Sequence, residues 1–252
     1  PEVVRGHSHL AAPRPATQIR DVLRGRDNFG HSYFTAKNPP RGAILDYWIG
    51  DSGAGQPAVV EILDGRGDVV RRLEESTAER GARRLVWDLR HEAPPSDSES
   101  SWRKPEGRFV LPGEYRVRLT VGDRVHTQPL SVGMDPAIEV TDRDRRALET
   151  TLALQARLLT AAYHAGKAVD VAVEQTRALL ATLEKAQASS LLNEARRAAD
   201  EARRLQIVLR GEELGIAQQE TYLPLAELTL RLYRTTESWT GAPSPEQERL
   251  TR

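Results

Sequence analysis

The chain has 252 residues, 36 Lys and Arg against 36 Asp and Glu, and no cysteine. This length is enough for two domains and for a sizeable core. A formal net charge of zero gives no overall field toward nucleic acid or an anionic membrane. The lack of cysteine excludes disulfides, thiolate zinc sites and cysteine nucleophiles.

The ends and the hydropathy of the chain limit its topology. No apolar run approaches the roughly 20 residues needed to span a bilayer, so we expect no transmembrane segment. The sequence begins at Pro1 and shows no basic-then-apolar leader. We therefore expect a processed product or a part of a longer polypeptide.

Residues 1–42 are expected to form an extended arm or linker. The first 41 residues carry seven Lys or Arg against three Asp or Glu, and Arg14, Arg20, Arg24 and Arg26 are among them. A basic arm that lies along a partner is one interpretation, and a solvated linker is the other.

Residues 43–134 have the alternating pattern of short strands between Gly, Pro and Asp turns. We expect six strands, at about 43–49, 58–64, 68–73, 83–89, 114–121 and 124–132. In the fifth, Tyr115, Val117 and Leu119 share one face, which is typical of an antiparallel sheet with one wet side. The spacing predicts a small β-sandwich with these three residues and Trp87 in its core.

After Asp135-Pro136 the apolar period becomes helical. Positions from 148 to 183 alternate steps of four and three without a slip. Because this register continues through Gly166, one long helix over about 141–186 is favoured over two helices with a turn at 164–167. The glycine costs about 1 kcal/mol relative to alanine.

Two shorter helices are expected to complete an antiparallel three-helix bundle over 138–240, which leaves 241–252 as a tail. The apolar stripe of the first, ended by Gly211, is Leu191, Ala195, Ala198, Ala202, Leu205 and Leu209. The stripe of the second, over about 222–239, is Leu225, Leu228, Leu232, Thr235 and Trp239. The fold class is thus α+β.

Three helices are too thin to hide every apolar stripe of the bundle. The side chains left over on the long helix include Leu154, Leu158, Val171 and Leu179. We interpret these four as a candidate face for a protein partner.

No motif of the sequence carries recognisable catalytic chemistry, and we expect no catalytic, metal or cofactor site. His7-Ser8-His9 could place two imidazoles near one metal ion, although a solvated tail is the better interpretation of so short a spacing. Arg66-Gly67-Asp68 spells an integrin-binding tripeptide, but it falls where a hairpin needs glycine, and turn chemistry accounts for it.

Several stretches resemble one family. Residues 32–43, SYFTAKNPPRGA, resemble a stretch that follows the propeller in large bacterial exported proteins with sortilin-type or neuraminidase-repeat β-propellers. Residues 60–64, 67–71, 85–90 and 112–117 resemble the immunoglobulin-like module of flagellar hook-cap type that comes next in those proteins. The helical part, down to residues 242–247, is similar to their C-terminal helices.

The resemblance implies an immunoglobulin-like fold for the sandwich and a place on the periplasmic or extracellular side of a bacterial envelope. Relatives are labelled glycosyl hydrolases or photosystem-stability-like factors because of a propeller that this sequence does not contain. We expect a non-catalytic subunit that docks on and stabilises an envelope or membrane-associated assembly, such as a photosynthetic complex. The alternative is the accessory C-terminal fragment of a β-propeller glycosidase or peptidase.

Overall fold

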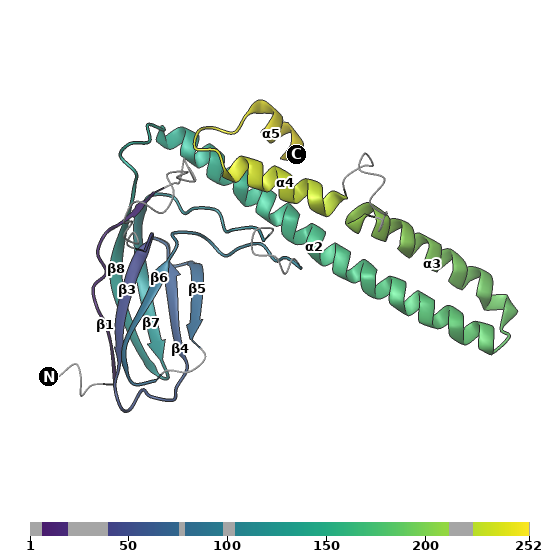
Figure 1. The fold of residues 1–252 in the computed structure, drawn as a ribbon, viewed down its shortest axis with the longest axis horizontal. Coiled ribbons are helices and arrows are strands. Elements are labelled where there is room, and N and C mark those ends of the chain that lie inside the picture. Colours follow the sequence, from purple (N-terminus) through teal and green to yellow (C-terminus); the bar gives the residue numbers. More distant parts are fainter. Residues whose placement is uncertain (1–6, 20–39, 76–78, 98–103, 212–223, 252) are drawn as a thin grey trace, which may run out of the picture. The chain divides into compact units, whose positions relative to one another are not determined.

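The computed structural model describes residues 7–19, 40–75, 79–97, 104–211 and 224–251 (Figure 1). Within them the fold is mixed α+β, with eight strands in two sheets and four helices. The chain divides into two compact units. Pro1–Glu92 and Gly107–Thr141 form the first, here the β unit, and Ala93–Glu106 and Asp142–Arg252 form the second, here the helical unit.

The β unit contains every strand of the described chain. The strands are β1 (Ser8–Leu10), β2 (Ala16–Gln18), β3 (Ala43–Ile49), β4 (Ala58–Leu63), β5 (Val69–Glu75), β6 (Gly81–Trp87), β7 (Gly113–Val121) and β8 (Arg124–Met134). One sheet has the order β1-β3-β6 and the other β2-β8-β7-β4-β5. Every neighbouring pair is antiparallel except β2 and β8, which run parallel.

The six expected strands are confirmed, with ends that differ by at most two residues. The expectation of an extended arm over residues 1–42 is wrong for its described part, because β1 and β2 belong to the two sheets. Each has only three residues with a buried, exposed, buried pattern, and this is too short to be recognised as alternation. Pro13 and Pro15 between them also argue against strands on sequence grounds.

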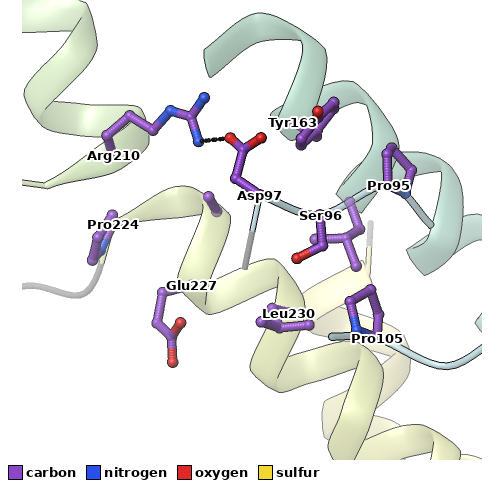
Figure 2. A pocket seen from close by; sticks show the side chains of 11 residues that line it. Pro95, Ser96, Asp97, Pro105, Tyr163, Arg210, Pro224, Glu227 and Leu230 are labelled. Carbon is purple, nitrogen blue, oxygen red and sulfur yellow. Dashed lines mark hydrogen bonds and ion pairs between the residues drawn. The ribbon is translucent and has the colours of Figure 1, made fainter. Parts of the chain in front are cut away.

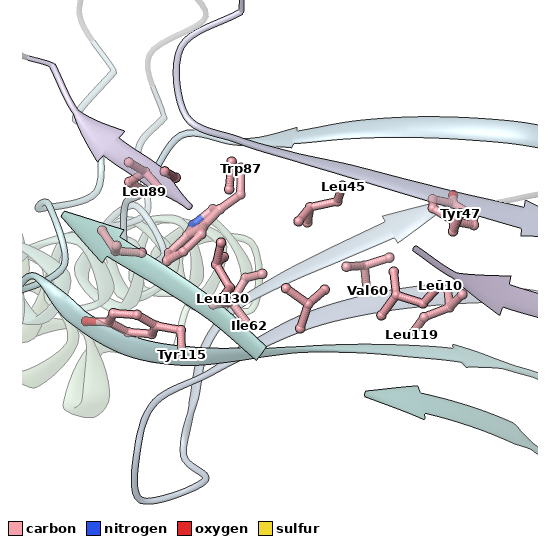
Figure 3. Packing of buried hydrophobic residues seen from close by; sticks show 14 of the residues in the cluster. Leu10, Leu45, Tyr47, Val60, Ile62, Trp87, Leu89, Tyr115, Leu119 and Leu130 are labelled. Carbon is pink, nitrogen blue, oxygen red and sulfur yellow. The ribbon is translucent and has the colours of Figure 1, made fainter. Parts of the chain in front are cut away.

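Side chains from both sheets meet in one hydrophobic core (Figure 3). Trp87, Val117 and Leu119 are fully buried and Tyr115 is nearly so, as predicted. The rings of Trp87 and Tyr115 meet edge to face, with centroids 5.7 Å apart. The indole Nε1–H of Trp87 donates a hydrogen bond to the carbonyl of Arg90 at 2.9 Å, so this buried donor is satisfied.

Glu61 ties three strands together on the outer face of the five-stranded sheet. It lies opposite Arg72 of β5 and Arg118 of β7. Each guanidinium donates two hydrogen bonds to one carboxylate oxygen, at 2.6 to 3.0 Å. Burial acts to raise the pKa of Glu61, but the hydrogen bonds from Arg118 and Arg72 outweigh it and hold the pKa below its usual value. A shift of this strand by one residue would break both pairs.

Polar contacts join β1, at the edge of its sheet, to β8 of the other sheet. The Ser8 hydroxyl hydrogen-bonds with Nε2 of His126 at 2.9 Å and with Nδ1 of His7 at 3.2 Å. Gln128 donates to the carbonyl of Leu10 at 3.2 Å. The imidazoles of His7 and of His126 in β8 therefore approach the same hydroxyl group. This hydroxyl belongs to Ser8, in a segment expected from its sequence to be a tail.

The β unit should lose stability in mild acid because of His126. Burial is the main cause that lowers the pKa of His126, and the charges of His9, His7 and Arg124 lower it further. The unfolded chain then binds more protons as the pH falls below about 6.5, so the free energy of unfolding decreases from there down to the folded pKa. Measured by urea unfolding, the free energy of unfolding should decrease less between about pH 7.5 and about pH 5.5 for His126→Gln than for the wild type. An equal decrease in the two proteins would contradict this account.

The helical unit is built on α2 (Asp142–Lys185), and α3 (Ser189–Arg210), α4 (Leu225–Glu237) and α5 (Pro245–Thr251) pack against it (Figure 1). The prediction of one continuous helix through Gly166 is confirmed. At 1.5 Å per residue, α2 is about 66 Å long. Gly211 ends α3, as expected, and its amide donates to the carbonyl of Ile207. Within the described residues no helix has both the length and the apolar character of a membrane span.

The predicted buried face of α3 is correct only in part. Ala195 and Ala202 are buried, but Leu191 and Leu205 are exposed. The small alanines allow α3 to approach α2 closely, and Gln206 then donates to Asp170 at 2.8 Å. The buried face of α3 is therefore centred on Ala195 and Ala202, with Leu192 and Leu209 half-buried at its ends, and Leu191 and Leu205 lie outside it.

The predicted buried face of α4 is wrong. Leu225, Leu228 and Trp239 are about half exposed, and Tyr233 and Thr236 are buried instead. The Tyr233 hydroxyl donates to the carbonyl of Glu106 at 2.8 Å, within the helical unit. This orientation buries the large aromatic ring of Tyr233 and satisfies its hydroxyl group.

The expected tail over 241–252 contains α5. Ser244 and Gln247 cap this helix reciprocally. The side chain of each residue accepts a hydrogen bond from the backbone N–H of the other. The buried Gln155 amide of α2 donates to Thr251 at 2.8 Å and to Thr236 at 3.2 Å. One glutamine thus joins α2, α4 and α5.

Candidate docking surface and pocket

A second apolar stripe follows α2 directly beside its buried positions, about 100° further around the helix. Its nine positions alternate steps of four and three and include no charged residue. They are Leu154, Leu158, Ala161, Ala165, Ala168, Ala172, Gln175, Leu179 and Thr182, here called the outer stripe. All are exposed except Ala172, which is half-buried. The buried residues of the same helix form the inner stripe, Leu148, Leu152, Gln155, Leu159, Ala162, Gly166 and Val173.

The four residues of the predicted partner face all lie on this exposed side. Leu154, Leu158 and Leu179 belong to the outer stripe and are 42%, 38% and 48% exposed. Val171, 51% exposed, lies in the adjacent row at heptad spacing with Arg157, His164, Ala178 and Lys185. The structure therefore brings the four together on one side of one helix, and what binds there stays a prediction.

The basic arm is described only at Arg14. This residue is exposed in the connection between β1 and β2. Arg20, Arg24 and Arg26 lie outside the described residues. The binding role expected for these arginines stays a prediction.

The helical unit also contains a pocket of about 320 Å³ (Figure 2). Its apolar wall consists of Pro95, Pro105, Leu159, Tyr163, Pro224 and Leu230. Asp97, Arg210 and Glu227 bring charge to its edge. The residues come from the 93–106 segment, α2, the end of α3 and the start of α4, so the pocket exists only when all four have packed.

The charges beside the pocket pair with one another. Arg210 donates one hydrogen bond to Asp97 and one to Asp170 of α2, both at 2.9 Å. Lys167 of α2 lies 2.9 Å from the other oxygen of Asp97. The hydrogen bond from Lys167 is the main cause that lowers the pKa of Asp97; burial opposes it, and Arg210 lowers the pKa further. The cluster thus braces α3 and the 93–97 segment against α2 at the edge of the pocket.

Gly166 makes room for this cluster. A Cβ atom at this position would lie 2.7 Å from Nε of Arg210 and 3.0 Å from its Cζ. The guanidinium of α3 therefore rests directly on the backbone of α2. This contact explains a glycine in the middle of a long helix, where its intrinsic propensity is poor.

Two sequence motifs are explained by local structure. Asp64 accepts hydrogen bonds from the amides of Arg66 and Asp68, both at 2.9 Å, and Gly67 has φ of +96°. The Arg-Gly-Asp tripeptide is therefore part of a tight turn between β4 and β5. The described part of the chain contains no group of three or more His, Asp or Glu side chains placed to hold a metal ion.

Comparisons with known proteins give little similarity. No protein-family model matches the chain, and no curated protein matches it. A crystal structure of dimeric latent PorU from Porphyromonas gingivalis is similar in part, at 19% sequence identity and a TM-score of 0.26. The match covers 39% of this chain and 9% of that chain.

Gly166 and Arg210 should be strongly coupled in stability. In an Arg210→Ala background, Gly166→Ala should stabilise the helical unit by about 1 kcal/mol, the usual gain in helix propensity. In the wild type the added methyl group displaces the guanidinium from Asp97 and Asp170, and the gain should be lost. A double-mutant cycle by urea unfolding should therefore give a coupling of at least about 1 kcal/mol. Additive effects would contradict the contact.

Proposed function

We propose that this protein is a non-catalytic binding subunit that docks on a larger assembly through the outer stripe of α2 and stabilises that assembly. The single observation that carries the proposal is the stripe itself. Its leucines are 38% to 48% exposed although the neighbouring inner stripe of the same helix is covered by α3, α4 and α5. Single exposed leucines are ordinary, but a continuous uncharged row from Leu154 to Thr182 is typical of an interaction face.

The rest of the α2 surface supports the same interpretation. Charged residues of the helix lie beside the outer stripe and not within it. Asp170 binds Arg210, and Glu184 lies 3.8 Å from Arg196 of α3. Apolar area that a partner covers contributes about 25 cal/mol per Å². A row of this length can therefore supply useful binding energy without any polar contact.

The finer parts of the proposal come from the family resemblance. In this view the β unit is an immunoglobulin-like sandwich of hook-cap type, and α2, α3 and α4 form a three-helix bundle. The location is the periplasmic or extracellular side of a bacterial envelope, and the partner belongs to a membrane-associated assembly such as a photosynthetic complex. The alternative is an accessory fragment of a propeller glycosidase or peptidase. The reading frame upstream of Pro1 would distinguish the two.

Charged substitutions in the outer stripe should release the protein from its assembly. Leu154→Glu combined with Leu179→Glu places two carboxylates where we expect an apolar partner, so co-sedimentation with native membranes or native complexes should be lost. Because both positions are exposed, the melting temperature should change little.

The matched control is Leu191→Glu, at a leucine of α3 that is 53% exposed and lies outside the outer stripe. This variant should co-sediment like the wild type. Retention of the double variant, or equal loss of the control, would contradict docking through the outer stripe.

A further inference from the structure

We infer that the outer stripe binds an α-helix of another protein, one with acidic side chains along one edge. This inference rests on the proposed function and adds the chemistry of the partner. It draws on three properties of the stripe: its period, its side-chain sizes and the charge of its neighbouring row.

The period of the stripe fits a helix. Steps of four and three repeat over nine positions, which is a mean spacing of 3.5 residues over about 42 Å. A second helix that supercoils gently with α2 stays in contact with such a stripe along its whole length. The straight edge of a sheet, or a loop, would meet only part of it.

The side-chain sizes indicate what the partner brings. Leu154 and Leu158 begin the stripe and Leu179 lies near its end, while the four middle positions from Ala161 to Ala172 are all alanine. Alanines leave shallow holes between leucines, so the complementary helix carries large apolar side chains opposite them. Gln175 is the one amide in the stripe, and such a residue favours a single register.

The charge of the row beside the outer stripe indicates that the partner helix has an acidic edge. The row with Val171 contains Arg157, His164 and Lys185 and no carboxylate. The carboxylates of this part of α2, Asp170, Glu174 and Glu184, lie on the far side of that row, toward the face that packs on α3. The row therefore offers a basic edge along the stripe.

A second copy of this chain is a poorer occupant. Antiparallel pairing of two outer stripes would place Arg157 and Lys185 of each copy along the same edge as those of the other. Parallel pairing would turn the basic row of one copy toward the row of Gln155 and Ala162 in the other, which is uncharged and already buried within that copy. Neither arrangement supplies carboxylates, whereas an acidic helix does.

The test uses the full chain and two synthetic helical peptides of about four heptads. Both have leucine along one seam; one has glutamate along one edge of that seam, and the other has lysine there. Fluorescence anisotropy at low salt should show binding of the acidic peptide at least about tenfold tighter than the basic one, with a difference that shrinks as salt is added. Leu158→Glu and, independently, Ala165→Glu should abolish binding of both peptides.

Charge reversal gives the matched comparison. Arg157→Glu with Lys185→Glu should remove or reverse the preference for the acidic peptide, while Glu174→Lys on the other side should leave it unchanged. Equal affinities for the two peptides, or binding of neither, would overturn the inference. Self-association of the full chain that is abolished by Leu158→Glu would overturn it in favour of a second copy.

The two proposals fail separately. If outer-stripe substitutions release the protein from its native assembly but the peptides are not discriminated, docking stands and the acidic helix does not. If the peptides bind as expected but the assembly retains the substituted protein, the stripe binds helices and the proposed docking role is wrong.

Discussion

The length of α2 is the constraint on which the helical unit depends. A helix of 44 residues is about 66 Å long, and it has apolar stripes on two sides. The inner stripe is covered by α3, α4 and α5, whose contacts with α2 build the core around Leu148, Leu152, Leu159 and Tyr233. The outer stripe has no such cover among the described residues. One long helix thus builds its own unit and presents a second face.

Such a helix also needs a brace near its middle. The contact between Gly166 and Arg210 provides one, since it fastens the end of α3 to α2 beside Asp97 and Asp170. The same ion cluster forms the edge of the pocket, so bracing and pocket share residues. Partly buried ion pairs of this kind add modest stability, but they fix which helix faces which. The brace keeps α3 in register with α2 and leaves the outer stripe free along its length.

The sequence predicted those elements whose period is long and regular. The six longer strands and the continuous α2 follow from alternation and from eleven positions in register. The faces of α3 and α4 could not be assigned in the same way, because each helix has two possible apolar faces. Contacts with other segments decide between them: Gln206 reaches Asp170 and Tyr233 reaches Glu106. β1 and β2 are too short to show a pattern.

The candidate sites differ in the same way in how far the sequence could predict them. The exposure of Leu154, Leu158, Val171 and Leu179 could be predicted from the sequence because these residues share one helix, and their role in binding stays a prediction. The pocket could not, because Asp97, Tyr163 and Arg210 come from separate segments that only folding brings together. The capping box of α5, Ser244 to Gln247, was a readable signal that the prediction of a tail overlooked. The sequence showed that Gly166 is unfavourable in a helix. Why a glycine stands there became clear only from the position of Arg210, which lies against it.

The most direct test of the account is whether the outer stripe is covered in the native assembly. The chain has no cysteine, so a single introduced thiol reports on one position only. Ala165→Cys should react rapidly with a maleimide in the purified protein and slowly in native membranes or complexes. Glu174→Cys, exposed on another row of α2, should react rapidly in both. Equal reactivity of Ala165→Cys in the two states would contradict the account.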